Sequence, residues 1–295
     1  DVEYINALLR LSGEIKLPSN IKAIAVGKLG RQNGDFTMGI FVAASGLKMA
    51  VGPGVFLDEI GGGFFINPVE EDLQLVRHMA KFTRPEMSDV MESKRPGGLD
   101  NPGEWAVMLL GGFYVTSKDT LSGRALVTVT SNFFNLDAEV KYKEDLLQGK
   151  VYLAVGWDPA YAEGVINIKM NFLKIIQGEG NLEFYVYSSE TWGVTGNFNV
   201  SLLGAEIASG SMFVGPPGFM LDARMGISID LIIVSGSISY EGMFWYNRKV
   251  NPATWGAYAA VEVSGEFLGG LLGATARLEG ALIGAPMFVI YAVGT

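Results

Sequence analysis

The chain contains no cysteine and a single histidine, His78, among its 295 residues. The absence of cysteine excludes disulfides, thiol catalysis and cysteine metal sites, and it leaves the cellular compartment open. Zinc sites need several histidine or cysteine ligands, which this chain cannot supply. Because no Gly-x-Ser-x-Gly element accompanies His78, we expect this histidine to be exposed or to cap a helix rather than to act in catalysis.

Charge is also scarce, since charged residues make up 18% of the chain and hydrophobic residues 49%. This composition excludes a disordered protein. The net charge of -9 would repel phosphate backbones, so we expect no nucleic-acid partner. The longest uncharged run, residues 280–295, is interrupted by Pro286 and is shorter than the roughly 20 residues of a spanning helix. We therefore predict no transmembrane helix.

Alternation of apolar and polar residues dominates what remains, most clearly over residues 165–187. Ile166, Ile168 and Met170 alternate with polar residues, and an apolar clump and the small run 178–180 follow before alternation resumes. A period of two is typical of a strand with one apolar face. The pattern predicts a strand, a bend at the small run and a second strand.

The same plan recurs along the second half of the chain at a spacing of roughly 30 residues, which is typical of stacked repeats. The copies lie at residues 197–214, 226–240 and 260–278, with a degenerate one at 127–142. We predict a mainly β fold, either a repetitive antiparallel meander or a sandwich-like sheet. It would comprise a β-rich part over residues 1–120 and a repeated-hairpin part over 121–295, or one continuous domain.

One helical pair interrupts the β pattern at about residues 68–95. Asn67 can cap a helix, Pro68 suits its first position, and Glu70 stands where a capping-box carboxylate reaches back. The apolar spacing predicts one helix over 68–82 and a second from Pro85 that ends before Pro96. Residues 2–11 also have helical spacing and predict a short amphipathic helix or a packed lead-in.

Three groups of residues are candidates for chemistry, and none has the pattern of a known site. Gly61, Gly62 and Gly63 lack the lysine and the spacing of a phosphate loop, so we expect a bend where another backbone approaches closely. Carboxylates gather at the start of the predicted helix, where they would complement its dipole, and in two other pairs without calcium-loop spacing. They are Glu70, Glu71 and Asp72, then Asp58 with Glu59, and Glu144 with Asp145. We predict no catalytic or cofactor-binding residue and no cofactor, and a metal site stays open.

Aromatic residues gather near the predicted turns, where they could stack on sugars, line a subunit contact or cover the ends of the sheet, the last being favoured. They are Trp157, Tyr161, Trp192, Trp245 and Tyr246. Strands around residues 231–233 and 267–272 are apolar on both faces. We expect such strands to be covered on both sides, by the helical pair, a second sheet, a neighbouring subunit or lipid.

Two segments, VFLDEIGGGFFINP at residues 55–68 and VEVSGEFLGGLLGATARLEGALIG at residues 261–284, resemble a family of large, β-rich bacterial proteins. No activity is assigned to that family, so the resemblance implies an architecture and no site. Its members are much longer. Since the chain also begins at Asp1 rather than Met, we expect a processed or partial chain.

The first functional hypothesis is a structural or assembly protein, a subunit at the cell surface or outside the cell that self-associates through sheet edges and apolar faces. It would form a homo-oligomer or polymer and would not be an enzyme. A second hypothesis is an outer-membrane β-barrel or a lipid-contacting protein, because alternating runs with aromatic ends are typical of both. A third is a carbohydrate-binding module or a glycoside-active enzyme, suggested by carboxylates and turn aromatics.

Overall fold

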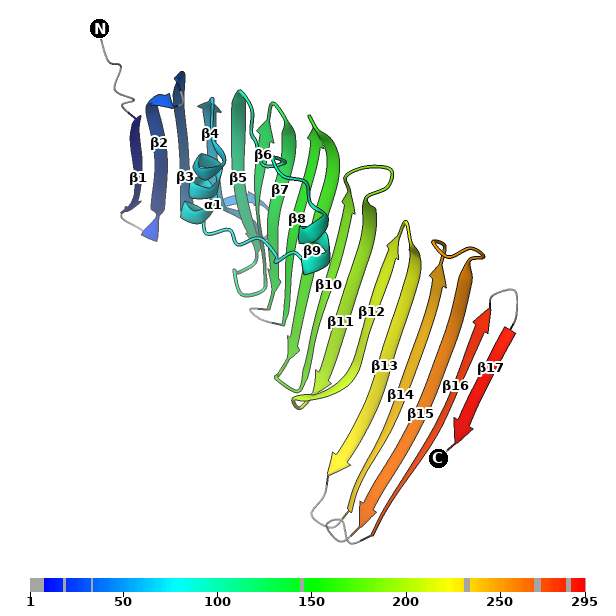
Figure 1. Ribbon diagram of the computed structural model, residues 1–295. Coiled ribbons are helices and arrows are strands. Elements are labelled where there is room, and N and C mark those ends of the chain that lie inside the picture. Colours follow the sequence, from blue (N-terminus) through cyan, green and yellow to red (C-terminus); the bar gives the residue numbers. More distant parts are fainter. Residues whose placement is uncertain are drawn as a thin grey trace. The chain divides into compact units, whose positions relative to one another are not determined.

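The structure is a computed structural model that describes residues 8–17, 20–32, 34–143, 146–230, 234–267, 272–284 and 288–294. The prediction of a mainly antiparallel β fold is confirmed, because the described residues form a 17-stranded sheet (Figure 1). Contacts divide the chain into two compact units, Asp1–Ile166 and Asn167–Thr295. The boundary predicted at residue 120 falls inside the first unit.

The strands of unit 1 form a meander in which each pairs antiparallel with the next along the chain. They are β1 (Leu8–Lys16), β2 (Lys22–Gln32), β3 (Asp35–Gly52), β4 (Val55–Ile66), β5 (Trp105–Val115), β6 (Leu121–Thr130), β7 (Phe133–Tyr142) and β8 (Leu147–Trp157). Strand β9 (Ala160–Phe172) begins in unit 1 and ends in unit 2.

Unit 2 continues with the same antiparallel hairpin connections. Its strands are β10 (Ile176–Val186), β11 (Trp192–Leu202), β12 (Ala205–Gly215), β13 (Gly218–Asp230), β14 (Val234–Asn247), β15 (Thr254–Phe267), β16 (Leu272–Gly284) and β17 (Phe288–Gly294). The tandem hairpins confirm the predicted repetition of strands.

The predicted helical pair is confirmed between β4 and β5, as α1 (Glu70–Met79) and α2 (Asp89–Lys94). The capping carboxylate differs from the prediction, because Asp72 rather than Glu70 accepts the Val69 N–H, at 2.9 Å. Asn67 does not cap α1 and instead donates its side-chain amide to the Phe36 carbonyl at 2.7 Å. Helix α2 begins after Ser88, whose hydroxyl accepts the Met91 N–H, so the predicted start at Pro85 was too early.

The helix predicted over residues 2–11 is wrong for its described part. Leu8 onward belongs to β1, where Leu9 pairs with Leu29 and Leu11 with Gly27 of β2. Helical spacing over one short stretch was outweighed by the hydrogen bonds and side-chain pairs that β2 offers. Residues 1–7 lie outside the described part of the chain.

The bends of the repeat also differ from the prediction. The small run 178–180 lies inside β10, and the chain reverses instead at residues 173–175 (Leu-Lys-Ile), where Leu173 and Lys174 have φ of 53° and 59°. The next hairpin likewise turns at Leu203 and Gly204, while 208–211 lies inside β12. Turns usually carry polar residues and glycine. In these hairpins the small residues lie inside the strands and leucines occupy the turns. The bend predicted at Gly61–Gly63 is wrong for the same reason, since all three lie within β4.

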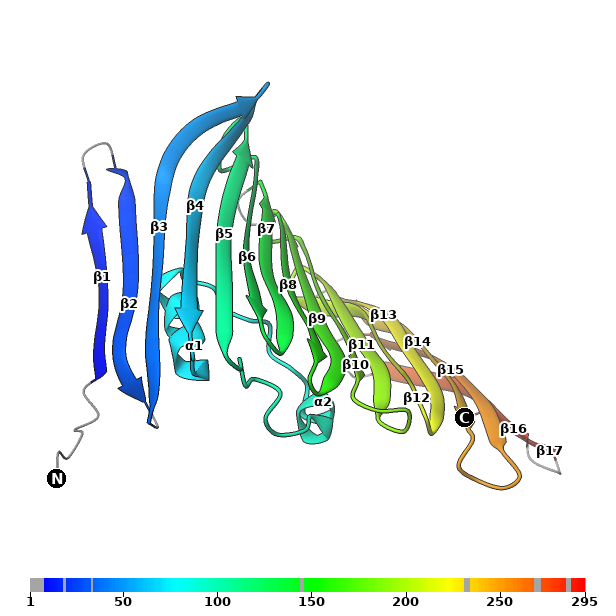
Figure 2. The same cartoon turned by 90° about the horizontal axis from the view of Figure 1, so that it is seen from above.

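Register and alternation place the side chains of each strand on two chemically different faces. In unit 1 the helices lie over one face (Figure 2), which we call the polar face because it carries nearly all the charged residues of the strands. Neither helix of the described residues lies over the opposite face, which we call the apolar face. The expectation of apolar residues on both faces holds for β5, where Met108 and Leu110 are buried on the polar face and Val107 and Leu109 lie on the apolar face. Residues 231–233 and 268–271, on which the expectation was based, lie outside the described part of the chain.

The core of unit 1 lies between the helices and the polar face. Leu73 and Val76 of α1 and Met91 of α2 are buried, as are Phe41 of β3 and Met108 of β5. A single-layer sheet cannot bury its own apolar side chains, so these strand residues are buried against the helices.

Glycines within the strands let neighbouring side chains and backbones approach closely. A Cβ on Gly63 would lie 2.5 Å from the Ile40 carbonyl oxygen and 2.7 Å from the Phe41 Cα. Elsewhere an aromatic ring lies over the glycine of a neighbouring strand, as Phe65 does over Gly39. The close approach predicted for the triple glycine of β4 is confirmed at Gly63.

We expect Gly63→Ala to lower the free energy of unfolding by about 1–3 kcal/mol, because the added methyl meets backbone atoms that cannot rotate away. Gly27→Ala is the matched control, since a Cβ there meets nothing within 4 Å. Urea unfolding followed by circular dichroism measures both. Equal stability of the two variants would contradict the close packing of β3 against β4.

Candidate functional site

The apolar face of unit 1 is a continuous surface of large side chains. Directly paired residues Ile40, Phe64 and Val107 lie on it, and Leu109 stands beside them. Ile40 is 59% exposed and Leu109 56%, although both lie in the middle of their strands. A soluble sheet usually buries this face against a second layer.

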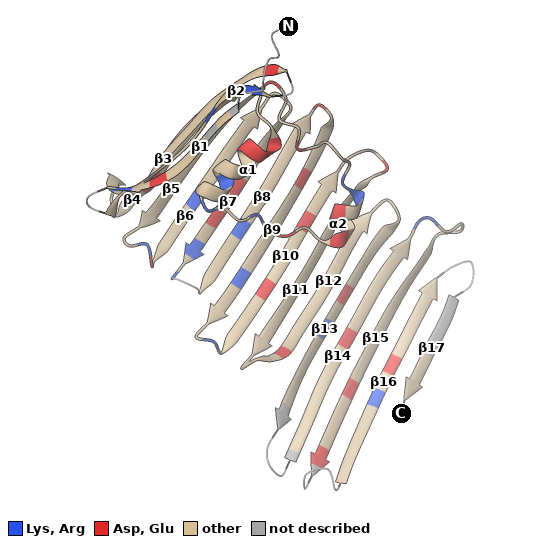
Figure 3. Ribbon diagram, turned by 60° about the vertical axis from the view of Figure 1, so that its left-hand side comes forward, with Lys and Arg blue, Asp and Glu red and all other residues tan. Residues whose placement is uncertain are grey.

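The apolar face of unit 2 repeats this composition without a charged side chain in its paired rows. One row consists of the direct partners Ile227, Ile238 and Val263, all of them exposed. Charged residues are coloured along the same strands in Figure 3. Arg224 and Glu241, for example, pair on the polar face, with a salt bridge of 3.1 Å. Alternation therefore concentrates charge on one side and hydrocarbon on the other.

Tryptophan lies at one end of the strands in each unit. The sites are all near the end of an even-numbered strand or the start of the next one: Trp105 and Trp157 in unit 1, and Trp192, Trp245 and Trp255 in unit 2. Register places four on the apolar face and Trp245 on the polar face. The expectation that aromatics cover strand ends is confirmed for Trp157, Trp192, Trp245 and Tyr246. Tyr161 is buried and donates its hydroxyl to the Leu99 carbonyl at 3.2 Å.

The described turns at the other end of the unit 2 strands expose large apolar side chains, next to Lys174 in one turn and Gly204 in the other. Leu173 is 73% exposed and Leu203 76%, and Ile175 is also exposed. Exposed leucine at a hairpin tip is costly in water, because nothing covers its hydrocarbon. Unit 2 therefore has exposed leucines in the turns at one end of its strands and tryptophans at the other end.

The polar face of unit 1 is a network of buried ion pairs that holds the helices. Lys28 of β2 contacts Asp72 of α1 at 2.5 Å, with both side chains almost fully buried. Asp137 of β7 accepts from Arg77 at 3.0 Å and from Arg84 at 3.2 Å. Such pairs stabilise a particular arrangement more than they add to overall stability, and removing one partner is costly.

A second part of the network follows α2. Arg95 donates to both oxygens of Asp100, at 2.6 and 3.0 Å, and to Glu163 of β9 at 3.0 Å. Glu163 also accepts the Tyr152 hydroxyl at 2.7 Å, and burial raises the pKa of Tyr152. Burial alone would raise the pKa of Asp100, but the hydrogen bonds from Arg95 together with the positive charges of Arg95, Arg84 and Arg77 outweigh it and hold that pKa below its usual value. We call Arg95, Asp100 and Glu163 the clamp, because each of these charges has an oppositely charged partner within the group.

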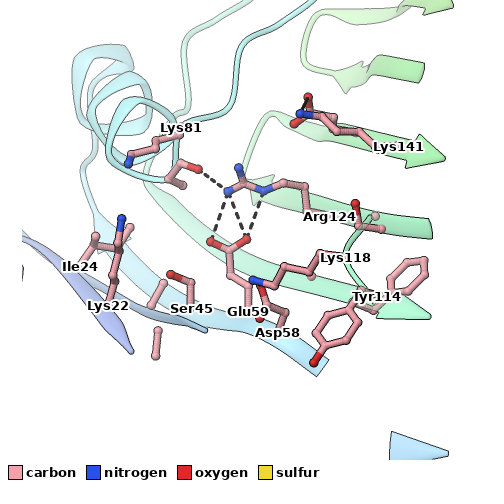
Figure 4. Close-up of a pocket in the computed structure, with 18 of the residues that line it drawn as sticks. Lys22, Ile24, Ser45, Asp58, Glu59, Lys81, Tyr114, Lys118, Arg124 and Lys141 are labelled. Carbon is pink, nitrogen blue, oxygen red and sulfur yellow. Dashed lines mark hydrogen bonds and ion pairs between the residues drawn. The ribbon is translucent and has the colours of Figure 1, made fainter. Parts of the chain in front are cut away.

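A polar pocket of about 300 Å³ opens beside the end of α1 (Figure 4). Arg124 donates there to Glu59 at 3.2 Å and to the Ala80 carbonyl, which ends α1. Burial raises the pKa of Glu59 despite Arg124. Lys118 pairs with Asp58 at 2.5 Å, and Lys22 and Lys141 have carboxylate partners at 3.8 and 3.6 Å. Most of the charged side chains that line the pocket are therefore paired with an opposite charge.

The residues singled out from the sequence do not converge on one site. His78 is exposed in the last turn of α1, and Glu70 and Glu71 are exposed at its start. Asp58 and Glu59 line the polar pocket, whereas Glu144 and Asp145 lie outside the described residues. The buried charges Lys28, Asp137 and Glu163, and the half-buried Arg95, were missed. A charged residue inside a predicted strand, such as Glu163 in YAEGV, could have indicated a charge that needs a partner from another element.

A comparison with known proteins finds no matching family model, no matching curated protein and no matching solved structure. The resemblance of residues 55–68 and 261–284 to the β-rich bacterial family therefore stays a prediction. Neither helix of the described chain has the length and hydropathy needed to cross a membrane. The described residues also contain no group of three or more histidine or carboxylate side chains arranged to hold a metal ion.

Asp100→Asn tests the clamp. Because its folded-state pKa is lowered, Asp100 stabilises the fold above the pKa of about 4 of an unfolded aspartate and loses this effect as the pH falls through the lower folded value. We expect the variant to be less stable at pH 7 by about 1–3 kcal/mol, and the difference to shrink towards pH 2. Urea unfolding at several pH values measures it.

The control is Asp119→Asn, at an exposed turn position. A pH-independent loss at Asp100, or an equal loss at Asp119, would show that the charge on Asp100 does not stabilise the clamp.

Proposed function

We propose that this protein is a lipid-contacting protein whose apolar sheet face is covered by lipid hydrocarbon. The observation that carries the proposal is a face of exposed aliphatic and aromatic side chains, without charge in its paired rows, that continues from strand to strand in both units. Exposed apolar patches on soluble monomers rarely exceed a few hundred Å².

The total accessible surface supports a covered face. It measures 17820 Å² for a 31.7 kDa chain. A compact monomer of this mass exposes roughly 12,000 Å², so roughly 5,800 Å² is in excess. Removing apolar surface from water is favourable by about 25 cal/mol per Å². Covering the apolar part of this surface would therefore stabilise the protein.

The two ends of the unit 2 strands favour lipid over a protein partner. Tryptophan is enriched where a membrane meets water, because its ring is apolar and its N–H is polar. Trp192 and Trp255 hold this position at one end, while Leu173 and Leu203 form apolar tips at the other. A polarity gradient along the strands suits a bilayer, which is itself polar outside and apolar within.

Self-association, the first hypothesis from the sequence, remains the second candidate. Two sheets pack face to face about 10 Å apart when aliphatic side chains interdigitate, and the uncharged rows of the apolar face would allow this. Light scattering without detergent separates the two, since a discrete dimer or polymer favours self-association and a need for detergent or lipid favours lipid contact. Carbohydrate binding and a cell-surface or extracellular location stay predictions.

Flotation with phosphatidylcholine vesicles tests the proposal. We expect wild type to float, and Ile227→Glu to bind vesicles at least about tenfold more weakly, because a carboxylate would enter hydrocarbon at a cost above 1.4 kcal/mol. Ser228→Glu is the matched control, since the next residue of β13 is also exposed but faces the polar side. We expect it to float as wild type does.

Two results would overturn lipid contact. One is a wild-type protein that stays in the aqueous fraction as a monodisperse species. The other is an equal effect of the two substitutions, which would show that the face does not matter.

A further inference from the structure

A hollow of about 630 Å³ lies on unit 2 among strands β10 to β15. Six of its large side chains belong to the apolar face by register: Leu182, Phe198, Met212, Leu221, Tyr240 and Phe244. Its lining also includes Asp222, Met243 and Tyr258, which register places on the polar face. The volume lies within the range of about 300–1,000 Å³ that holds small molecules in proteins. The hollow is therefore large enough for a ligand and apolar in its walls.

Small residues form the floor of the hollow in a row across the strands. Gly210 pairs with Ala223, and Ala223 pairs with Gly242. The Phe198 ring lies over Gly210 and the Tyr240 ring lies against Gly242, so the exposed Ala223 is the open part of this floor. Strands lie about 4.8 Å apart, so the six strands from β10 to β15 span about 24 Å. One leaflet of a bilayer, about 15 Å deep, is as thick as one acyl chain, so an extended chain fits across the strands.

The charge distribution selects a hydrocarbon chain, without charge along its length, as the occupant of the hollow. The charged groups of these strands are on the polar face, as with Asp222, which pairs with Met243 behind the floor. Among the described residues of unit 2, the Tyr240 hydroxyl is the one polar side-chain group on the apolar face away from the strand ends. It lies over Gly242, 3.0 Å from where a Cβ would stand. One end of the hollow can thus hydrogen-bond, and the rest offers only hydrocarbon.

We propose that this hollow binds one fatty acid, its chain extended across the strands towards Leu182 and its carboxyl group accepting the Tyr240 hydroxyl. The inference rests on the proposed function and deepens it by naming a single-chain ligand at one place on the apolar face. A covering bilayer alone would need no such hollow.

Native mass spectrometry of the full chain released from detergent, with palmitic acid added, tests the site. We expect wild type to retain one palmitate. Ala223→Leu should retain at least tenfold less, with Ala223→Val between them, because these side chains fill the floor. Ala223 is exposed and already carries a Cβ, so the backbone need not move. Ala276→Leu is the control, at an exposed alanine of the same face outside the hollow.

Tyr240→Phe keeps the ring and removes the hydroxyl, and we expect retention of palmitate to fall severalfold. Unchanged retention would overturn the position of the carboxyl group. Wild-type retention of no palmitate, or equal retention by Ala223→Leu, would overturn the site. If the same proteins still float with vesicles, the failure belongs to the fatty-acid site alone, whereas loss of wild-type flotation contradicts lipid contact itself.

Discussion

The structure depends on one constraint, the strict alternation of side chains in strands whose neighbours are fixed in register. Directly paired residues on neighbouring strands point to the same face of the sheet. A charged residue on one strand therefore lies beside its partner on the next strand, on the same face. Arg224 and Glu241 on one side, and Ile227 and Ile238 on the other, follow from the same pairing of β13 with β14. A shift of a single residue would exchange the two faces, so the apolar face itself fixes the register.

Only one of these faces is covered by the chain's own helices. In unit 1 the ion pairs of Lys28 with Asp72 and of Arg95 with Glu163 tie the helical segment to the polar face. Apolar burial of Leu73, Val76 and Met91 acts on the same side, so both terms hold the helices there. The clamp thus leaves the apolar face open to another partner, and this is the physical link between the buried network and the proposed lipid contact.

Much of the fold was predictable from the sequence, because a period of two is a strong local signal and Ile166, Ile168 and Met170 carry it plainly. The helical pair was predictable from Pro68 and the apolar spacing that follows. The turns were not, because Leu173 and Leu203 occupy positions where glycine or asparagine is usual. Residues 8–11 were misassigned because their strand partner lies about twenty residues away in β2.

The candidate site was harder to predict than the fold. Apolar excess pointed to a covered face, but which side of each strand stays open depends on where α1 and α2 lie, and no local pattern encodes that. The hollow of unit 2 arises from Gly210, Ala223 and Gly242, which come from three strands and become neighbours only through register. Asp137 and Glu163 likewise acquire their partners from the helical segment, more than fifty residues away.

The most direct measurement uses the absence of cysteine, which allows a single spin label at each position of β14 from 236 to 246. With the protein bound to vesicles, lipid contact predicts that accessibility to oxygen alternates with a period of two, high at even-numbered positions such as 238 and low at 239. A water-soluble relaxation agent should show the opposite phase. Equal accessibility at both sets of positions, or high water accessibility at 238, would contradict a lipid-covered apolar face.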